Sequence, residues 1–171
     1  AEAYKEGKKM TTSCCPAFKN YIEKHFPILK DAISETVSPM CAASRYIKEK
    51  FPGAVTVFIG PCIAKKAESM SGEKDTADYA LTYGEIRAML RAKGVKLEPE
   101  EDTDDQGSIY GKKFANAGGV TAAVLESMKE LGCTGDVSVC KCSGITECKK
   151  ALTLMKVGRL PEDFIEGMVC E

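Results

Sequence analysis

Apolar residues recur at helical spacing directly after Pro16. Four of them are three or four positions apart and would share one helix face: Phe18, Tyr21, Ile22 and Phe26. Proline is favoured at the first position of a helix, because its missing N–H would have no partner there. The pattern predicts a helix over 16–26. The single histidine, His25, lies among its amphipathic residues, so we expect a structural role for it.

Further helices are predicted where apolar spacing is joined to capping residues. Ser38 can cap a helix that Pro39 opens, and the later "FPG" ends that helix. The segment "YGEIRAMLRAKG" predicts a helix that stops at Gly94. Its inward residues would be Ile86, Met89 and Leu90. Two more helices are predicted over 119–131 and 145–158.

Short apolar segments rich in β-branched residues lie between the helices. The run "AVTVFIG", stopped by a Gly-Pro pair, predicts a buried strand. We expect four strands, at 55–59, 78–82, 136–142 and 164–169. Because helices separate them, the predicted fold class is α/β, an about four-stranded parallel sheet with helices on both faces, formed as a single lobe by residues 1–171. Sites in such sheets lie at the carboxyl ends of the strands, where Cys62 and Cys170 fall.

The charged residues are nearly balanced, with 24 basic and 25 acidic side chains. No basic tract would attract phosphate groups, so nucleic acid is not an expected partner. No apolar run reaches the roughly 18 residues of a membrane span, so we expect no membrane partner and predict a cytoplasmic protein. Nine cysteines are many for that compartment, where cysteine clusters mark metal or redox chemistry more often than disulfides.

Two of the cysteines, Cys14 and Cys15, are adjacent in the segment "TTSCCPAFKN". Neighbouring side chains on an extended chain point to opposite sides, so one thiolate could bind a metal while the other faces a different space. The residues alone leave a second interpretation open, because free cysteine is also among the most buried residue types. Cys41, on a predicted helix, is expected to pack in the core.

Three cysteine-bearing segments carry a family resemblance. "TSCCPAF", "GPCIAKKAE" and "DFIEGMVCE", in this order, resemble the three cluster-binding motifs of the iron-only ([FeFe]) hydrogenases. The segments "SPMCAASRYIKEKFP", "ADYALTYGEI" and "NAGGVTAAVLES" also resemble those that lie between the motifs, so the resemblance extends over essentially the whole chain.

The resemblance implies a ligand set for the H-cluster, which joins a four-iron four-sulfur (4Fe-4S) cubane to a di-iron subsite. Cys15, Cys62 and Cys170 would be cubane ligands, in keeping with the preference of iron-sulfur clusters for thiolates. Cys14 would face the di-iron subsite and pass protons to and from it.

The second motif implies two further catalytic residues. Lys65 would hydrogen-bond a cyanide on the iron, and its charge would also stabilise nearby thiolates. Glu68 would belong to the proton path. Three positions separate them, so the two side chains can meet if the segment is helical.

The chain departs from the family pattern at two positions and at both ends. Phe18 stands in place of the usual tryptophan, and Gly60 in place of a methionine that packs on the di-iron site. The lobe that precedes "TSCCP" in the family, and the bridging cysteine that follows the last motif, are absent from the sequence. We therefore expect a fragment of a divergent member, apo and inactive in isolation, whose exposed cleft surface promotes a homodimer.

The implied function is that of a hydrogenase, an oxidoreductase that interconverts hydrogen with protons and electrons and exchanges the electrons with a carrier such as ferredoxin. The alternative is a non-catalytic or sensory iron-sulfur protein on the same scaffold, which Gly60 favours.

A third interpretation is a zinc-binding module built on four cysteines: Cys133, Cys140, Cys142 and Cys148. Cys140 and Cys142 would share one face of a strand, whereas Cys148 would lie on a helix. The spacing matches no usual zinc pattern, so packing is the expectation. The "DTDDQG" segment over 102–107 begins like a calcium loop, but Lys113 stands where the bidentate glutamate belongs, so we predict a solvated acidic loop.

Overall fold

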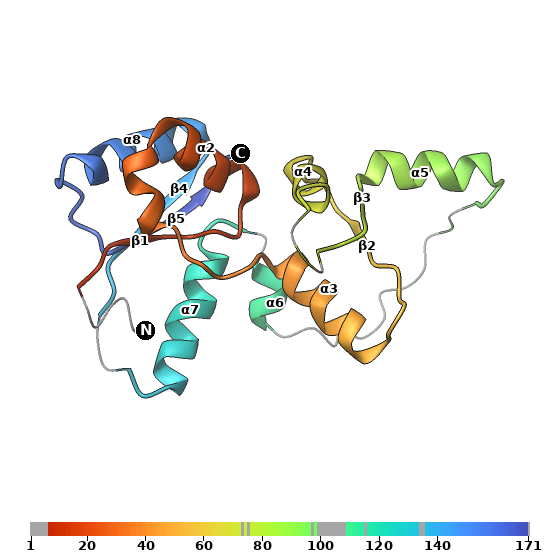
Figure 1. The fold of residues 1–171 in the computed structure, drawn as a ribbon, viewed down its shortest axis with the longest axis horizontal. Helices are drawn as coiled ribbons and strands as arrows, with labels where there is room; N and C mark the ends of the chain where they lie inside the picture. The colour runs from red at the N-terminus through yellow and green to blue at the C-terminus, as the bar shows by residue number, and fades with distance from the viewer. Residues whose placement is uncertain are drawn as a thin grey trace. The chain divides into compact units, whose positions relative to one another are not determined.

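The protein is described by a computed structural model over residues 7–72, 74, 76–96, 98, 109–114, 116–133 and 136–170. The chain divides into two compact units (Figure 1). Unit 1 consists of residues 1–36 and 106–171, and unit 2 of residues 37–105. Each unit is described by itself. The predicted acidic loop at 102–107 lies outside the described residues.

Unit 1 is built on a parallel sheet of three strands in the order β1-β5-β4. The strands are β1 (Met10–Thr11), β4 (Val139–Ser143) and β5 (Phe164–Met168). Ile165 of β5 pairs with Thr11 on one side and with Cys140 on the other. All three strands therefore end at the same edge of the sheet.

The helical segments of unit 1 are α2 (Pro16–His25), η1 (Pro27–Ala32), α6 (Ile109–Lys113), α7 (Gly119–Glu130) and α8 (Ile145–Lys156). Two neighbouring residues of β5 show that helices cover both faces of the sheet. Gly167 lies against the ring of Phe18 from α2. Glu166, which points the opposite way, accepts hydrogen bonds from Thr121 of α7.

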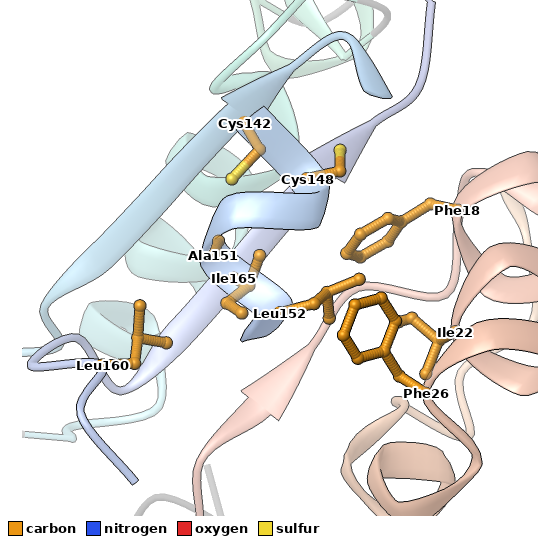
Figure 2. Close-up of a cluster of buried hydrophobic side chains, with 9 residues drawn as sticks. All are labelled: Phe18, Ile22, Phe26, Cys142, Cys148, Ala151, Leu152, Leu160 and Ile165. Atoms are coloured by element: carbon orange, nitrogen blue, oxygen red, sulfur yellow. The ribbon is translucent and has the colours of Figure 1, made fainter. Parts of the chain in front are cut away.

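The core of unit 1 lies between the sheet, α2 and α8 (Figure 2). Its fully buried side chains include Phe18, Ile22, Leu152 and Ile165. Burying each of them contributes about 2 kcal/mol of hydrophobic stabilisation. The predicted apolar face of α2 is thus confirmed, with Phe26 also buried and Tyr21 partly buried. His25 is exposed and stacks beside Tyr21, with 4.7 Å between the ring centroids.

Unit 2 contains a parallel pair of strands, β2 (Val57–Ile59) and β3 (Tyr79–Leu81), with helices α3 (Pro39–Lys50), α4 (Ala64–Ser69) and α5 (Tyr83–Ala92). The predicted cap of α3 is confirmed, because the Ser38 hydroxyl accepts a hydrogen bond from the Cys41 N–H. Cys41 is fully buried, as expected.

Polar side chains fasten α3 to the sheet of unit 2. The hydroxyls of Ser44 and Thr56 are 2.8 Å apart and buried. The Asp78 carboxylate accepts hydrogen bonds from the backbone and hydroxyl of Thr56 and from the Lys48 ammonium. These bonds draw the pKa of Asp78 from 3.8 to about 2, the Lys48 bond having the largest effect.

The α/β class and the parallel pairing are confirmed, but the strands are not arranged as expected. The four expected strands form, yet they belong to two sheets, and β1 was not predicted. The β2 strand is also less buried than predicted, since Val57 and Ile59 are each 47% exposed. The predicted inward face of α5 is only partly formed, because Ile86 and Leu90 are half-buried and Met89 is 54% exposed.

Candidate metal centre

In unit 1 the adjacent cysteines follow the carboxyl end of β1. The preceding residues are fixed to β5, because the Thr12 N–H donates to the Ile165 carbonyl and the Gly167 N–H donates to the Thr12 hydroxyl. Ser13 then donates through its hydroxyl to the Thr36 carbonyl over 2.5 Å. The backbone leading into the cysteines is thereby held on the sheet.

Cys15 is the N-cap residue of α2, with an extended backbone (φ −92°, ψ 107°) and no capping hydrogen bond from its side chain. Its half-buried thiol packs against the core of unit 1. The N-terminus of a helix favours a thiolate, because the backbone dipoles place partial positive charge there. Cys14, also half-buried, is the residue immediately before it.

Cys170 lies two residues beyond the end of β5 and is exposed. Because β1 and β5 are parallel neighbours, Cys15 and Cys170 both follow the same edge of one sheet. This placement agrees with the sequence expectation for these two residues. Their assignment as cluster ligands stays a prediction.

In unit 2, Cys62 follows the carboxyl end of β2 and is half-buried. The Gly60 N–H donates to the Leu81 carbonyl of β3, which holds the segment against the sheet. The ring of Phe58 lies over Gly60, so that a Cβ atom at residue 60 would be 2.8 Å from two ring atoms. The position where the family has a methionine is therefore closed by this chain's own phenylalanine.

Helix α4 brings together the two charged residues of the second motif. Lys65 and Glu68 form an ion pair of 2.7 Å between Nζ and Oε2, and their side chains are only 10% and 11% exposed. The expectation that a helix would let them meet is confirmed. A buried charged pair is costly to desolvate, so its presence here calls for a reason beyond packing.

The adjacent Lys66 has a different partner, the Glu85 carboxylate at the start of α5. Glu85 also closes a capping box with Thr82. The Lys66 hydrogen bond, followed by those from Thr82, lowers the pKa of Glu85 to about 2. Lys65 and Lys66 are thus neighbours in sequence with separate ion pairs.

Within the described part of the chain, no three or more His, Cys, Asp or Glu side chains form a group that could hold a metal ion. The zinc interpretation of Cys133, Cys140, Cys142 and Cys148 therefore has no matching geometry there. Cys15 and Cys170 belong to unit 1 and Cys62 to unit 2. That all three bind one cluster stays a prediction, although thiolates are the donors that an iron-sulfur cubane requires.

Glu166 has a structural role in this region that the sequence analysis did not predict. Its carboxylate is buried and accepts hydrogen bonds from the N–H groups of Gly118 and Thr121 and from the Thr121 hydroxyl. Gly118 has a left-handed backbone (φ 86°) that glycine adopts without strain. Glu166, on the strand that leads to Cys170, thus caps the N-terminus of α7. Its partner Thr121 is 45 residues away in the sequence, so no local sequence pattern could have identified the contact.

Comparison with known proteins relates this chain to hydrogenases. A sequence model of the family described as "Iron only hydrogenase large subunit, C-terminal domain" matches residues 1–171. The periplasmic [Fe] hydrogenase large subunit of Nitratidesulfovibrio vulgaris is 30% identical, over 93% of this chain and 48% of the relative. The NADP-reducing hydrogenase subunit HndD of Solidesulfovibrio fructosivorans is 30% identical, over 73% of this chain and 24% of the relative. The chain thus spans at most about half the length of these relatives.

Two solved structures share the fold. One, of HydA(deltaEFG), concerns stepwise assembly of the [FeFe]-hydrogenase H-cluster; it has a TM-score of 0.71 and 23% identity, covering 99% of this chain and 62% of that one. The other is a variant of [FeFe]-hydrogenase HydA1 from Chlamydomonas reinhardtii, with a TM-score of 0.70, 23% identity and the same coverage.

The periplasmic relative corrects one expectation. The sequence predicted a cytoplasmic protein, and the periplasmic hydrogenase that aligns with 93% of the chain contradicts that prediction. None of the helices in the described residues has both the length and the apolar character of a membrane span. That finding does not distinguish compartments.

Proposed function

This chain belongs to the iron-only hydrogenase family, in which it matches the C-terminal domain of the large subunit, and we propose that it forms part of an H-cluster domain that interconverts hydrogen with protons and electrons. One observation carries the proposal. The proposed ligand cysteine of each motif lies two to four residues beyond the carboxyl end of a parallel strand, β1, β2 or β5. In parallel α/β sheets, this edge is where binding sites are built.

The three thiolates of Cys15, Cys62 and Cys170 hold the 4Fe-4S cubane. The donor chemistry fits, because cubanes are held by cysteine thiolates. Cys15 is also the N-cap residue of α2, with no hydrogen bond from its side chain to the helix. When bound, the H-cluster supplies the redox centre for hydrogen chemistry.

Lys65 binds the anionic cyanide of the di-iron subsite through its ammonium. The 2.7 Å bond to Glu68 supports this role, since it holds the nearly buried ammonium in one place.

Cys14 and Glu68 carry protons. Cys14 is half-buried and immediately precedes the ligand Cys15 in the chain. A thiol and a carboxylate both exchange protons, and Glu68 is held by Lys65. In the whole protein, a carrier such as ferredoxin exchanges the electrons, and hydrogen and protons are the substrates.

Gly60 favours the second candidate, a sensory protein of the same scaffold. The space beside residue 60 is taken by the ring of Phe58, so the contact that a methionine makes with the di-iron site in the family is not reproduced. A protein that binds hydrogen without fast turnover can dispense with that contact.

The test uses the full-length parent protein, matured and purified without oxygen. A hydrogenase evolves hydrogen from a reduced dye, and Cys14→Ser should abolish evolution while leaving the iron content unchanged. Cys62→Ser should lower the iron content. Cys133→Ser, which alters another half-buried cysteine, is the control for both.

Lysine variants separate the role of Lys65 from general charge effects. Lys65→Met should lower hydrogen evolution at least tenfold, whereas Lys66→Met, which breaks the pair with Glu85, should not. Full iron content with little turnover in the wild type would favour the sensor. Equal iron content in the wild type and in Cys62→Ser would refute the ligand assignment.

A further inference from the structure

Three thiols of unit 1 lie in a row on the sheet face that α2 and α8 cover. Cys140 Sγ and Cys142 Sγ, both on β4, are 3.7 Å apart. Cys142 also lies near Cys148 of α8, close enough for each thiol to shift the pKa of the other. The Cys148 thiol donates to the Met168 carbonyl over 3.7 Å. Figure 2 shows Cys142 and Cys148 at one end of the core. Both are buried, whereas Cys140 is half-buried and is the accessible end of the row.

The geometry of β4 allows the first two thiols to be joined. Residues two apart on a strand share a face and have Cα atoms about 6.6 Å apart, near the upper end of the range for disulfides. Their sulfurs would have to approach from 3.7 Å to the ~2.05 Å of an S–S bond. Rotation about the Cα–Cβ bonds is not enough, because the Cβ atoms of a disulfide are about 3.5–4.5 Å apart and β4 must therefore bend locally at Lys141. In the described sheet β4 is an edge strand, where such local bends occur.

We propose that Cys140 and Cys142 form an oxidisable dithiol, which a hydroperoxide converts into an intramolecular disulfide. The Cys140 thiolate attacks one peroxide oxygen, the O–O bond breaks, and hydroxide leaves, giving a sulfenic acid. The Cys142 sulfur then attacks the sulfur of Cys140, the S–O bond breaks and the S–S bond forms. In total, two thiols and one hydrogen peroxide give one disulfide and two waters, and the sulfurs lose two electrons.

The surroundings of the dithiol make the reaction slow at neutral pH. Burial, then the neighbouring Cys142 thiol and the carboxylates of Glu162 and Glu147, raise the pKa of Cys140 to about 12. Since the thiolate is the nucleophile, the rate should rise about tenfold per pH unit below that value. Brief exposure to oxidant therefore leaves the dithiol reduced, and sustained exposure closes it.

A consequence of the disulfide bears on the candidate metal centre, and this consequence alone rests on the proposed function. A Cys142 sulfur turned toward Cys140 moves away from Cys148. Cys148 contacts the Met168 carbonyl on the strand that leads to Cys170, and Cys15 packs against the same core cluster. Oxidation would thus loosen the packing beneath two proposed ligands.

Peptide mapping of the full-length parent protein tests the dithiol. The reduced protein is treated with hydrogen peroxide at pH 7 and pH 9, its remaining thiols are alkylated, and it is cut after glutamate. Cys140 and Cys142 then share a peptide, while Cys148 falls in the next one. The expected product is that first peptide lighter by two hydrogen atoms and unalkylated at both thiols, formed roughly a hundredfold faster at pH 9.

Serine variants assign the bond. Cys140→Ser and Cys142→Ser should each abolish the product, whereas Cys133→Ser, which removes the third cysteine of that peptide, should retain it. The wild-type peptide map depends on no variant, so it decides the outcome where thermal unfolding shows that a serine variant has lost its fold.

Two outcomes would overturn the proposal: alkylation of both thiols after prolonged oxidation at pH 9, or a cross-link from Cys142 to the Cys148 peptide. The iron content before oxidation is measured in parallel. Its absence would count against the cluster assignment and would leave the dithiol result unaffected.

Discussion

The ring of Phe58 lies over Gly60, with two ring carbons only 2.8 Å from the position that a Cβ atom at residue 60 would take. Real Cβ contacts are longer, so any side chain at this position requires the ring to move. The two residues are therefore coupled. A methionine at residue 60 and a phenylalanine in the present rotamer at residue 58 exclude each other.

Gly60→Met should therefore destabilise the protein by about 1 to 3 kcal/mol, the usual cost of overpacking. The double variant Phe58→Ala/Gly60→Met should recover part of that loss, because the ring no longer competes for the space. Thermal unfolding of the wild type, Gly60→Met, Phe58→Ala and the double variant measures the coupling. Gly84→Ala is the matched control, since its Cβ would meet only the Thr82 hydroxyl at 3.9 Å and should change little. A double variant whose loss of stability equals the sum of the two single losses would contradict the coupling.

A second pair of this kind fixes α2 on the sheet of unit 1. A Cβ atom at Gly167 would overlap the ring of Phe18, which is fully buried. Gly167→Ala should cost about 1 to 3 kcal/mol, and Phe18→Leu should relieve it in the double variant. Denaturant unfolding gives both values. A Gly167→Ala protein as stable as the wild type would show that α2 can move away without loss.

The elements that the sequence predicted well are those whose causes are local. Helix α2 was predicted because its apolar period and Pro16 lie within one segment, and the Ser38 cap for the same reason. The Lys65–Glu68 pair followed from a spacing of three on a helix. Each of these depends on neighbours in the chain, so the pattern contains the information.

The elements that were missed depend on distant partners. The β1 strand has two residues, too few for an alternating pattern, and it exists because β5 pairs with it. The apolar run of β2 was predicted to be buried, but Val57 and Ile59 find too few partners in a chain that covers only part of its relatives' length. The partition into two sheets is likewise a matter of long-range pairing. The ligand set came from the family resemblance rather than from any pattern.

Acid should weaken unit 2 through Asp78. The pKa of this carboxyl is lowered in the folded state, from 3.8 to about 2, first by the Lys48 hydrogen bond. A lowered folded pKa means that the stabilisation is complete above 3.8 and is lost as the pH falls through 2. Asp78→Asn should therefore lose stability relative to the wild type at neutral pH, and the difference should shrink between pH 3.8 and pH 2.

Thermal midpoints of the wild type and Asp78→Asn, measured across that acid range, test this expectation. Lys48→Met removes the cation from the same pair and should flatten the acid limb in the same way. A difference between wild type and Asp78→Asn that stays constant down to pH 2 would show that the carboxylate gains nothing from its partners.

The last prediction concerns the isolated chain, which we expect to be free of iron, inactive and dimeric. Val57, Ile59 and Tyr79 share one face of the β2–β3 sheet and are 47%, 47% and 61% exposed. Exposed apolar patches promote association, because burying them removes apolar surface from water. Light scattering should therefore give a dimer, and Val57→Thr/Ile59→Thr should shift it toward the monomer without changing the strand character. Ala42→Thr, at an exposed position of α3, is the control that should remain dimeric.

Iron analysis after anaerobic purification tests the expectation that the isolated chain is free of iron, since three cysteines should hold a cubane less firmly than four. A monomer with four irons per chain would refute both expectations.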